Sequence, residues 1–141
     1  MADIENWIIQ TKQKTGNYGE IIATFVIDLD YNLLINDRHS EHVVCANGKN
    51  VLSAGEITFE RVHHKAEKSL LVSQISNLST GYCPSPSSWE AVAKALAKTG
   101  VAYPEYFTTA FEFRICKNCH WVNVIKEEDF VCANGECQNT L

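Results

Sequence analysis

The chain has 141 residues, of which 45% are apolar and 21% charged, and its formal net charge is −5. This apolar fraction is sufficient to bury a core, which argues against global disorder, and the length favours a single domain. The sequence has no run of basic residues. Because binding to a phosphate backbone depends on lysine and arginine, nucleic acid is a disfavoured partner.

The sequence also bears on the compartment. The first residues lack a basic segment followed by an apolar run, so we expect no signal peptide. No apolar stretch reaches the roughly 18–20 residues that a membrane span needs. In a chain without an export signal, six cysteines indicate metal binding in preference to disulfides. We therefore expect a cytoplasmic protein without a membrane partner.

The first half of the chain predicts one helix and several strands. Asp3 is placed to cap a helix that carries Ile4, Trp7 and Ile8 on one face and ends at Gly16. β-branched and alternating segments then predict three pairs of strands. The first pair, 21–27 and 33–35, is joined by a turn at 28–32, and the second, 42–46 and 50–52, by the Asn47-Gly48 pair. The third pair, 57–62 and 70–75, is separated by a polar break at 63–68.

The second half predicts a helix followed by short strands. Ser87 and Glu90 have the spacing of a capping box, in which the two side chains satisfy free backbone N–H groups. The helix that follows ends at Gly100 and places one apolar stripe on its surface, made of Trp89, Val92, Ala93 and Leu96. Strands are expected at 110–115, 121–125 and 130–131.

Four cysteines near the end of the sequence form two close pairs, Cys116 with Cys119 and Cys132 with Cys137. Each pair can wrap one side of an ion, and the intervening strands bring the pairs together, as a tetrahedral zinc site requires. This pattern resembles the knuckles of zinc-ribbon and rubredoxin-like proteins over the last quarter of the chain. The resemblance implies structural Zn²⁺, because four thiolates leave no open coordination position. His120 is the alternative ligand.

Strands in series, without helices alternating between them, predict an α+β fold. We expect a mostly antiparallel sheet, a meander of hairpins, with two helices and a C-terminal zinc-ribbon-like hairpin. Residues 1–109 would form the α+β domain. Residues 110–141 would form the hairpin, docked on that domain as one compact unit.

Two further resemblances keep an enzyme among the alternatives. His39 and Glu41, taken with Cys116 and Cys119, are similar to the signature of the zinc nucleobase deaminases. This implies that the histidine and two cysteines hold zinc and that the glutamate transfers protons. The apolar segment 25–30, which ends in Asp28-Leu29-Asp30, resembles the first motif of the haloacid-dehalogenase-like phosphatases. There Asp28 would be the nucleophile and Asp30 the general acid.

The loop at residues 79–88 is rich in serine and proline and precedes the predicted second helix. Loops held by a rigid scaffold often carry binding residues, so Tyr82, Cys83 and Trp89 form a candidate binding loop. Cys83 is also a candidate nucleophile. Its base would be a histidine from elsewhere in the chain, namely His39, His42, His63 or His64.

These patterns favour a small cytosolic zinc-containing protein that binds another protein as an adaptor or regulator, without catalysis. Contact would occur through the 79–88 loop, the hairpin or both. The alternatives are an enzyme, by the deaminase-like, phosphoryl-transfer or Cys83 thiol route, and a zinc ribbon that binds nucleic acid. No pattern in the sequence specifies an oligomeric state.

Overall fold

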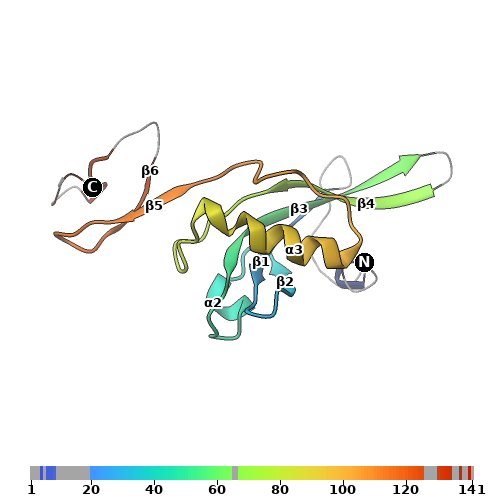
Figure 1. The fold of residues 1–141 in the computed structure, drawn as a ribbon, viewed down its shortest axis with the longest axis horizontal. Coiled ribbons are helices and arrows are strands. Elements are labelled where there is room, and N and C mark those ends of the chain that lie inside the picture. Colours follow the sequence, from blue (N-terminus) through green and yellow to red (C-terminus); the bar gives the residue numbers. More distant parts are fainter. Residues whose placement is uncertain are drawn as a thin grey trace.

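The fold has a four-stranded antiparallel sheet in its main body and a two-stranded sheet near the C-terminus (Figure 1). This computed structural model describes residues 4, 6–8, 20–64, 67–125, 130–134, 137 and 140. The helices are α2 (His42–Cys45), the 3-10 turn η1 (Pro86–Ser88) and α3 (Trp89–Thr99), with further helical residues at 4 and 6–8. The predicted α+β class is thus confirmed. In the part of the chain that the structure describes, no helix is long and apolar enough to cross a membrane.

The main sheet has the strand order β2-β1-β3-β4. Its strands are β1 (Glu20–Ile27), β2 (Leu33–Asp37), β3 (Ser53–His64) and β4 (Glu67–Ile75), and each neighbouring pair is antiparallel. Because β3 pairs with β1 on the side opposite β2, the connection that carries α2 crosses from one side of β1 to the other.

The predicted polar break at residues 63–68 is wrong. β3 continues through His64 and β4 begins at Glu67. These two residues face each other across the strands, so the backbone remains paired although the sequence there is polar. Cross-strand pairing, which the composition of one strand does not show, decides where such a hairpin turns.

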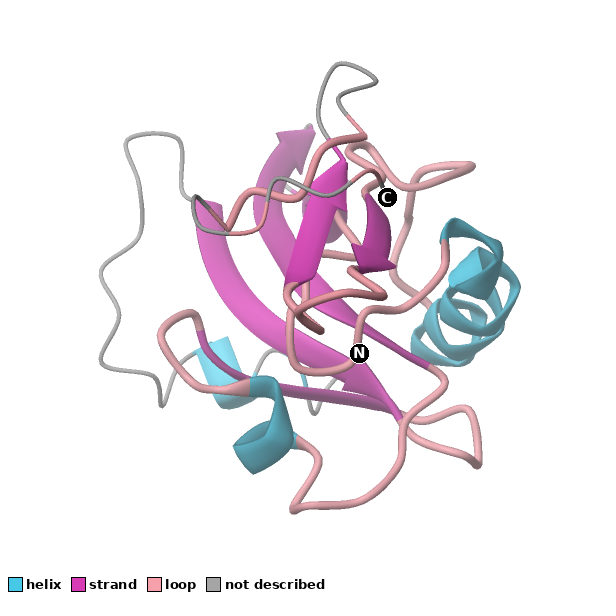
Figure 2. Ribbon diagram, turned by 90° about the vertical axis from the view of Figure 1, so that its left-hand side faces the viewer, coloured by secondary structure: helices cyan, strands magenta, loops and turns pink. Residues whose placement is uncertain are grey.

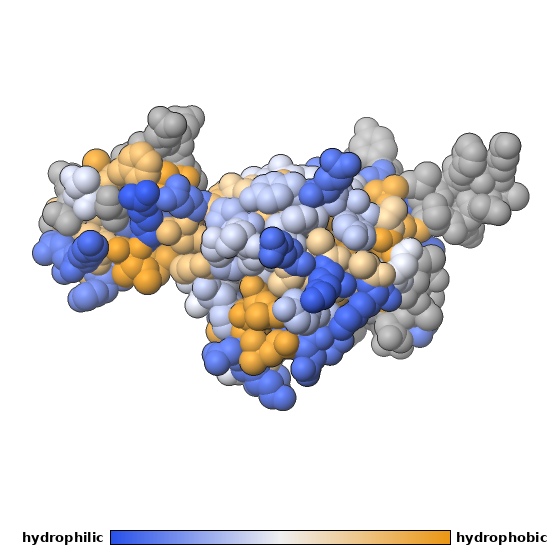
Figure 3. Space-filling model, viewed as in Figure 1, coloured by the Kyte–Doolittle hydropathy of each residue, from blue (hydrophilic) through white to orange (hydrophobic). Residues whose placement is uncertain are grey.

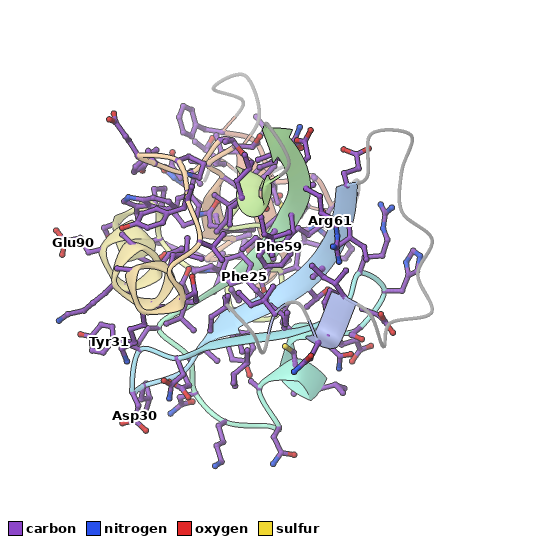
Figure 4. All side chains as sticks on the ribbon, turned by 90° about the vertical axis from the view of Figure 1, so that its right-hand side faces the viewer. Phe25, Asp30, Tyr31, Phe59, Arg61 and Glu90 are labelled. Atoms are coloured by element: carbon purple, nitrogen blue, oxygen red, sulfur yellow. The ribbon has the colours of Figure 1, made fainter. Side chains whose placement is uncertain are left out.

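The core lies between the sheet and α3, which covers one face (Figures 1 and 2). Phe25 of β1 and Phe59 of β3 have exposed fractions of 0% and 1% and lie at the centre of the interior (Figure 4). Val92, Ala95 and Leu96 of α3 are buried in the same cluster. Their spacing of three and four residues places them on one face of the helix.

The helix at the start of the chain also packs on this core. Ile4 is buried there, and Trp7 and Ile8 lie partly buried against the cluster, as the spacing predicts. Its expected cap at Asp3 and its expected end at Gly16 lie outside the described residues.

The predicted hairpin around Asn47-Gly48 is wrong, because residues 42–45 form the short helix α2. Asn47 and Gly48 do have positive φ angles, 54° and 74°, but there they end a helical turn. After the helix, Ala46 packs against Val26 and Ala54. Val26 alternates along β1 with Phe25, so this second cluster occupies the face of the sheet opposite α3.

The start of α3 also differs from the prediction. Ser88, not Ser87, precedes the helix and makes no side-chain cap hydrogen bond, and the Ser87 hydroxyl donates to Ser85 Oγ at 2.9 Å, so the predicted capping box of Ser87 and Glu90 does not form. The chain enters through η1, where Ser85 Oγ accepts the N–H of Ser87 at 3.3 Å. Pro86 suits the first position of this turn because it needs no hydrogen-bond acceptor. The predicted end is confirmed, since Gly100 has φ 75°.

After α3 the chain runs parallel to β4, along the edge of the sheet. The N–H of Val72 donates to the carbonyl of Ala102 at 2.8 Å, and the N–H of Thr108 donates to the carbonyl of Ile75 at 2.9 Å. Bridges at both ends of this segment, Leu71 with Ala102 and Ser76 with Thr109, have parallel geometry. The segment therefore covers the outer edge of β4 from Leu71 onward before the chain continues into the hairpin.

Asn77 fastens this segment to the rest of the main body. Its exposed fraction is 0%. Nδ2 donates to the carbonyl oxygens of Pro84 and Phe111, each at 2.9 Å, and Oδ1 accepts the N–H of Phe111 at 2.7 Å. One buried amide thus connects β4, the loop before η1 and the segment that leads to the hairpin.

The hairpin consists of β5 (Glu112–Ile115) and β6 (Val122–Ile125). Figure 1 shows it at one end of the molecule, beyond the end of the main sheet. The strands pair antiparallel with Phe113 opposite Val124 and Ile115 opposite Val122. Directly opposed residues point to the same face, so these four apolar residues share one face of the hairpin.

Candidate metal centre

The first cysteine pair lies in the turn of the β5–β6 hairpin. Cys116 follows β5 directly, and its N–H donates to the carbonyl of Trp121 at 2.9 Å. The N–H of His120 donates to the carbonyl of Cys116 at 2.8 Å, and His120 takes a positive φ of 64°. These bonds curl the chain so that Cys116 and Cys119 point to the same side.

The second pair lies on the chain that follows the hairpin. Val131 forms an antiparallel bridge with Thr140, which brings the two ends of this segment together. Within it, the N–H of Cys137 donates to the carbonyl of Asn134 at 2.9 Å. Cys132 and Cys137 both lie between the two bridged residues.

The four sulfur atoms lie within 4.8 Å of one another, and this group can hold a metal ion. The Sγ atoms of Cys116 and Cys137 are 3.7 Å apart, and those of Cys119 and Cys132 are 3.6 Å apart. One member of each knuckle is enclosed, with exposed fractions of 0% for Cys116 and 3% for Cys132. Both of these sulfur contacts join one knuckle to the other.

The backbone around Cys116 favours its ionised form. Hydrogen bonds from the backbone N–H of Cys119 and, to a smaller extent, of Asn118 outweigh the opposing effect of burial and, with the side-chain contacts of Cys137 and Cys119, lower the pKa of the Cys116 thiol to about 6. A thiolate is the form in which cysteine binds metal. The turn therefore prepares this sulfur for coordination.

Two asparagine side chains also donate to cysteine sulfur. Asn118 Nδ2 lies 3.2 Å from the Sγ of Cys137, and Asn123 Nδ2 lies 3.6 Å from the Sγ of Cys132. Asn123 is 3% exposed and also accepts the N–H of Ala133 at 2.7 Å. Sequence reasoning did not identify these residues. The available signal was an asparagine in an otherwise apolar strand, where a buried amide needs partners.

Within the described residues, the four cysteines are the only group of three or more side chains arranged to hold a metal. His120, the predicted alternative ligand, does not belong to it, and neither does His39 or Glu41 of the deaminase-like pattern. His39 and Glu41 directly precede α2 on the main body, and the cysteines lie at the hairpin (Figure 1). Cys132 and Cys137 complete the group where that pattern needs a histidine.

The Asp28-Leu29-Asp30 stretch forms a hydrogen-bonded turn. Asp28 Oδ1 accepts the N–H groups of Asp30 at 2.9 Å and Asn32 at 2.8 Å, and Oδ2 accepts Asn32 Nδ2 at 3.2 Å. Partial burial raises the pKa of Asp28, but these bonds outweigh it and the pKa lies below its usual value. The carboxylate thus stabilises the turn between β1 and β2. A hollow of about 280 Å³ beside it is lined by Leu34, Lys49 and Val51, among others.

The three residues of the predicted binding loop do not meet at one site. Tyr82 packs with Val26 on the α2 face, and its hydroxyl donates to the carbonyl of Lys49 at 2.8 Å. Trp89 packs on the α3 face. The Cys83 Sγ donates to the carbonyl of Thr80 at 3.3 Å, and burial raises the pKa of this thiol.

The fold and the cysteine group define an α+β protein with a candidate four-cysteine metal centre at a terminal hairpin. Comparisons with family models, curated proteins and solved structures found no match for this chain. Its function is therefore inferred from its own residues.

Proposed function

We propose that this chain is a non-catalytic protein-binding protein, an adaptor or regulator, whose terminal hairpin is held in shape by one structural Zn²⁺. The observation that carries the proposal is the sulfur geometry. A tetrahedral ion with bonds of about 2.3 Å to sulfur places neighbouring sulfur atoms about 3.8 Å apart. The two sulfur pairs that join the knuckles measure 3.6 Å and 3.7 Å.

Four thiolates support a structural role because they fill the coordination shell of zinc and leave no position for substrate or water. A two-stranded hairpin is only marginally stable by itself. Metal binding supplies free energy of folding to such small units. In this proposal Cys116, Cys119, Cys132 and Cys137 bind the ion, and Asn118 and Asn123 orient the second pair through their N–H···S contacts.

The hairpin surface supports a protein partner. One of its faces carries Phe113, Ile115, Val122 and Val124, of which Ile115 is 61% exposed and the other three are half-buried. The second knuckle packs on the opposite face, where Phe130 stacks on the Arg114 guanidinium at 4.6 Å and Asn123 is buried. Figure 3 shows apolar atoms at the surface of the hairpin. Contiguous exposed apolar side chains are typical of protein-binding sites.

The metal is tested on protein purified without added metal. We expect about one zinc per chain by elemental analysis, no visible absorption, and four further reactive thiols after chelation. Substitution of Cys132 by serine should reduce zinc content, whereas the matched change Cys83→Ser should leave it unchanged. A coloured protein containing iron, an absence of metal, or fewer than four protected cysteines would contradict the zinc assignment.

The partner is tested by placing a photo-crosslinking amino acid at Ile115 in the cell. The matched control is Glu112, on the opposite face of the same strand. We expect a defined protein adduct from position 115 that is absent from position 112 and lost in the Cys132→Ser background. An equal yield at both positions would refute binding through the apolar face. An adduct between two copies of this chain would identify the partner as the protein itself.

A further inference from the structure

A second exposed cluster, made of aromatic residues, lies on the main body away from the metal centre. Trp89, at the start of α3, contacts three rings from the segment that follows the helix. Its ring centroid lies 6.5 Å from Tyr103, 5.9 Å from Tyr106 and 5.1 Å from Phe107. Phe107 is 6% exposed and anchors the cluster, whereas Tyr103 and Tyr106 are 38% and 47% exposed. The rings are tilted by 53° to 68° to Trp89, so they do not form one flat surface.

The cluster offers hydrogen-bond donors. Among the described residues, neither the indole N–H of Trp89 nor the hydroxyl of Tyr103 has a hydrogen-bond partner. The hydroxyl of Tyr106 donates to the carbonyl of Pro86 in the same chain at 3.4 Å. One ring of the cluster thus already contacts a proline carbonyl within the protein itself. Aromatic side chains that combine an apolar ring with a free donor are suited to a partner that has both apolar rings and free carbonyl groups.

The charge around the cluster is acidic. Glu105 stands between the two tyrosines in the sequence, and Glu90 follows Trp89; both are exposed, and neither has an ion-pair partner in the described part of the chain. Figure 4 shows Glu90 pointing away from α3. The lysines of α3 are engaged elsewhere, since Lys94 lies 4.5 Å from the centre of the Tyr31 ring and Lys98 donates to the carbonyl of Asp30 at 3.0 Å. This surface therefore favours a basic partner.

We propose that the aromatic cluster of Trp89, Tyr103, Tyr106 and Phe107 binds a proline-rich peptide segment that carries a basic residue. A polyproline helix has no internal hydrogen bonds, so its carbonyl groups are free to accept from Trp89 and Tyr103. Its proline rings can pack against the exposed rings of Tyr103 and Tyr106, and little conformational entropy is lost on binding. The basic residue pairs with Glu105. Stacked nucleic-acid bases fit less well, because acidic neighbours repel phosphate and the tilted rings offer no common plane.

The test is a titration of ¹⁵N-labelled full-length protein with an oligoproline peptide and with the same peptide extended by one arginine. We expect saturable shifts of the Trp89 indole N–H resonance, assigned by comparison with the variants Trp7→Phe and Trp121→Phe, because the chain has three tryptophans. The arginine peptide should bind about two- to fivefold more tightly, as an exposed ion pair allows. Glu105→Gln should remove that difference. Tyr103→Phe, which deletes one hydroxyl, should weaken both peptides about fivefold.

Tyr31→Phe is the matched control, because it deletes a hydroxyl from a tyrosine on the other side of α3 and should leave both affinities unchanged. Chelation of the metal should also leave them unchanged, which separates this site from the proposed hairpin function. No shift of the Trp89 resonance at about 1 mM peptide would overturn the proposal. An equal loss of peptide affinity in Tyr31→Phe would also overturn it. So would saturable binding of single-stranded DNA, or of a sugar chain such as chitotetraose that could stack on the same rings, without binding of oligoproline.

Discussion

Replacing Asn77 by alanine should destabilise the main body more than any surface change in the chain. The substitution removes three hydrogen bonds, of 2.7, 2.9 and 2.9 Å, and leaves two carbonyl groups and one N–H without their partner. At about 1 kcal/mol for each bond, the free energy of unfolding should fall by about 3 kcal/mol. An unfolding entropy of about 2.1 cal/mol/K per residue, taken over 141 residues, converts this to a fall in Tm of about 10 °C.

Urea unfolding followed by circular dichroism measures this loss directly. The matched control is Asn36→Ala, because Asn36 is half-exposed and bonds the neighbouring N–H of Asp37. We expect the control to change the free energy of unfolding by less than about 0.5 kcal/mol. If Asn77→Ala costs less than about 1 kcal/mol, the carbonyls of Pro84 and Phe111 find other partners, and the role given to Asn77 is wrong.

Three other outcomes are expected. Gly55→Ala should lower the free energy of unfolding, measured in urea, by at least about 2 kcal/mol, because a Cβ there would overlap the carbonyl oxygen of Ser76. Gly48→Ala is its control: no atom lies within 4 Å of the added carbon, so the positive φ alone should lower the free energy of unfolding by about 1 kcal/mol. The pKa of Asp28 is lowered in the folded protein, so its stabilising effect should be complete above about pH 4 and be lost as the pH falls through the folded pKa. Asp28→Asn should remove that part of the acid dependence of stability. If the free energy of unfolding varies with pH in the same way in this variant, the hydrogen bonds of the turn do not stabilise the fold. Chelation of the metal should remove hydrogen-exchange protection from the amides of Cys116 and His120, while the amides of β1 and β3 keep their protection. If the amides of both sheets lose protection together, the hairpin is not a separate folding unit.

The sequence predicts those parts of the fold that depend on local pattern. The apolar run before Asp28 is β1, the stripe that ends at Gly100 is α3, and the spacing of four cysteines predicts a group that the structure assembles. In each case the residues that determine the feature lie close together in the sequence. The α+β class follows because such segments, read in order, already separate strands from helices.

The errors arise where distant residues decide the outcome. The valines at 43 and 44 favour a strand, but β3 takes the pairing position beside β1 and leaves that segment to form α2. The amide of Asn77 bonds Phe111, 34 residues away, and nothing near Asn77 in the sequence indicates this. The strand order and the separation of Tyr82 from Trp89 onto opposite faces are likewise properties of the assembled sheet.

The segment that runs beside β4 has a consequence for self-association. An uncovered strand edge exposes N–H and carbonyl groups to which a strand from another molecule can add, and this is a common start of aggregation. Here the 102–109 segment covers the β4 edge from Leu71 onward, and the opposite edge is β2, a strand of only 5 residues. Short edges offer few backbone groups for such addition. Both features shorten the stretch of edge at which a strand from another molecule could extend the main sheet.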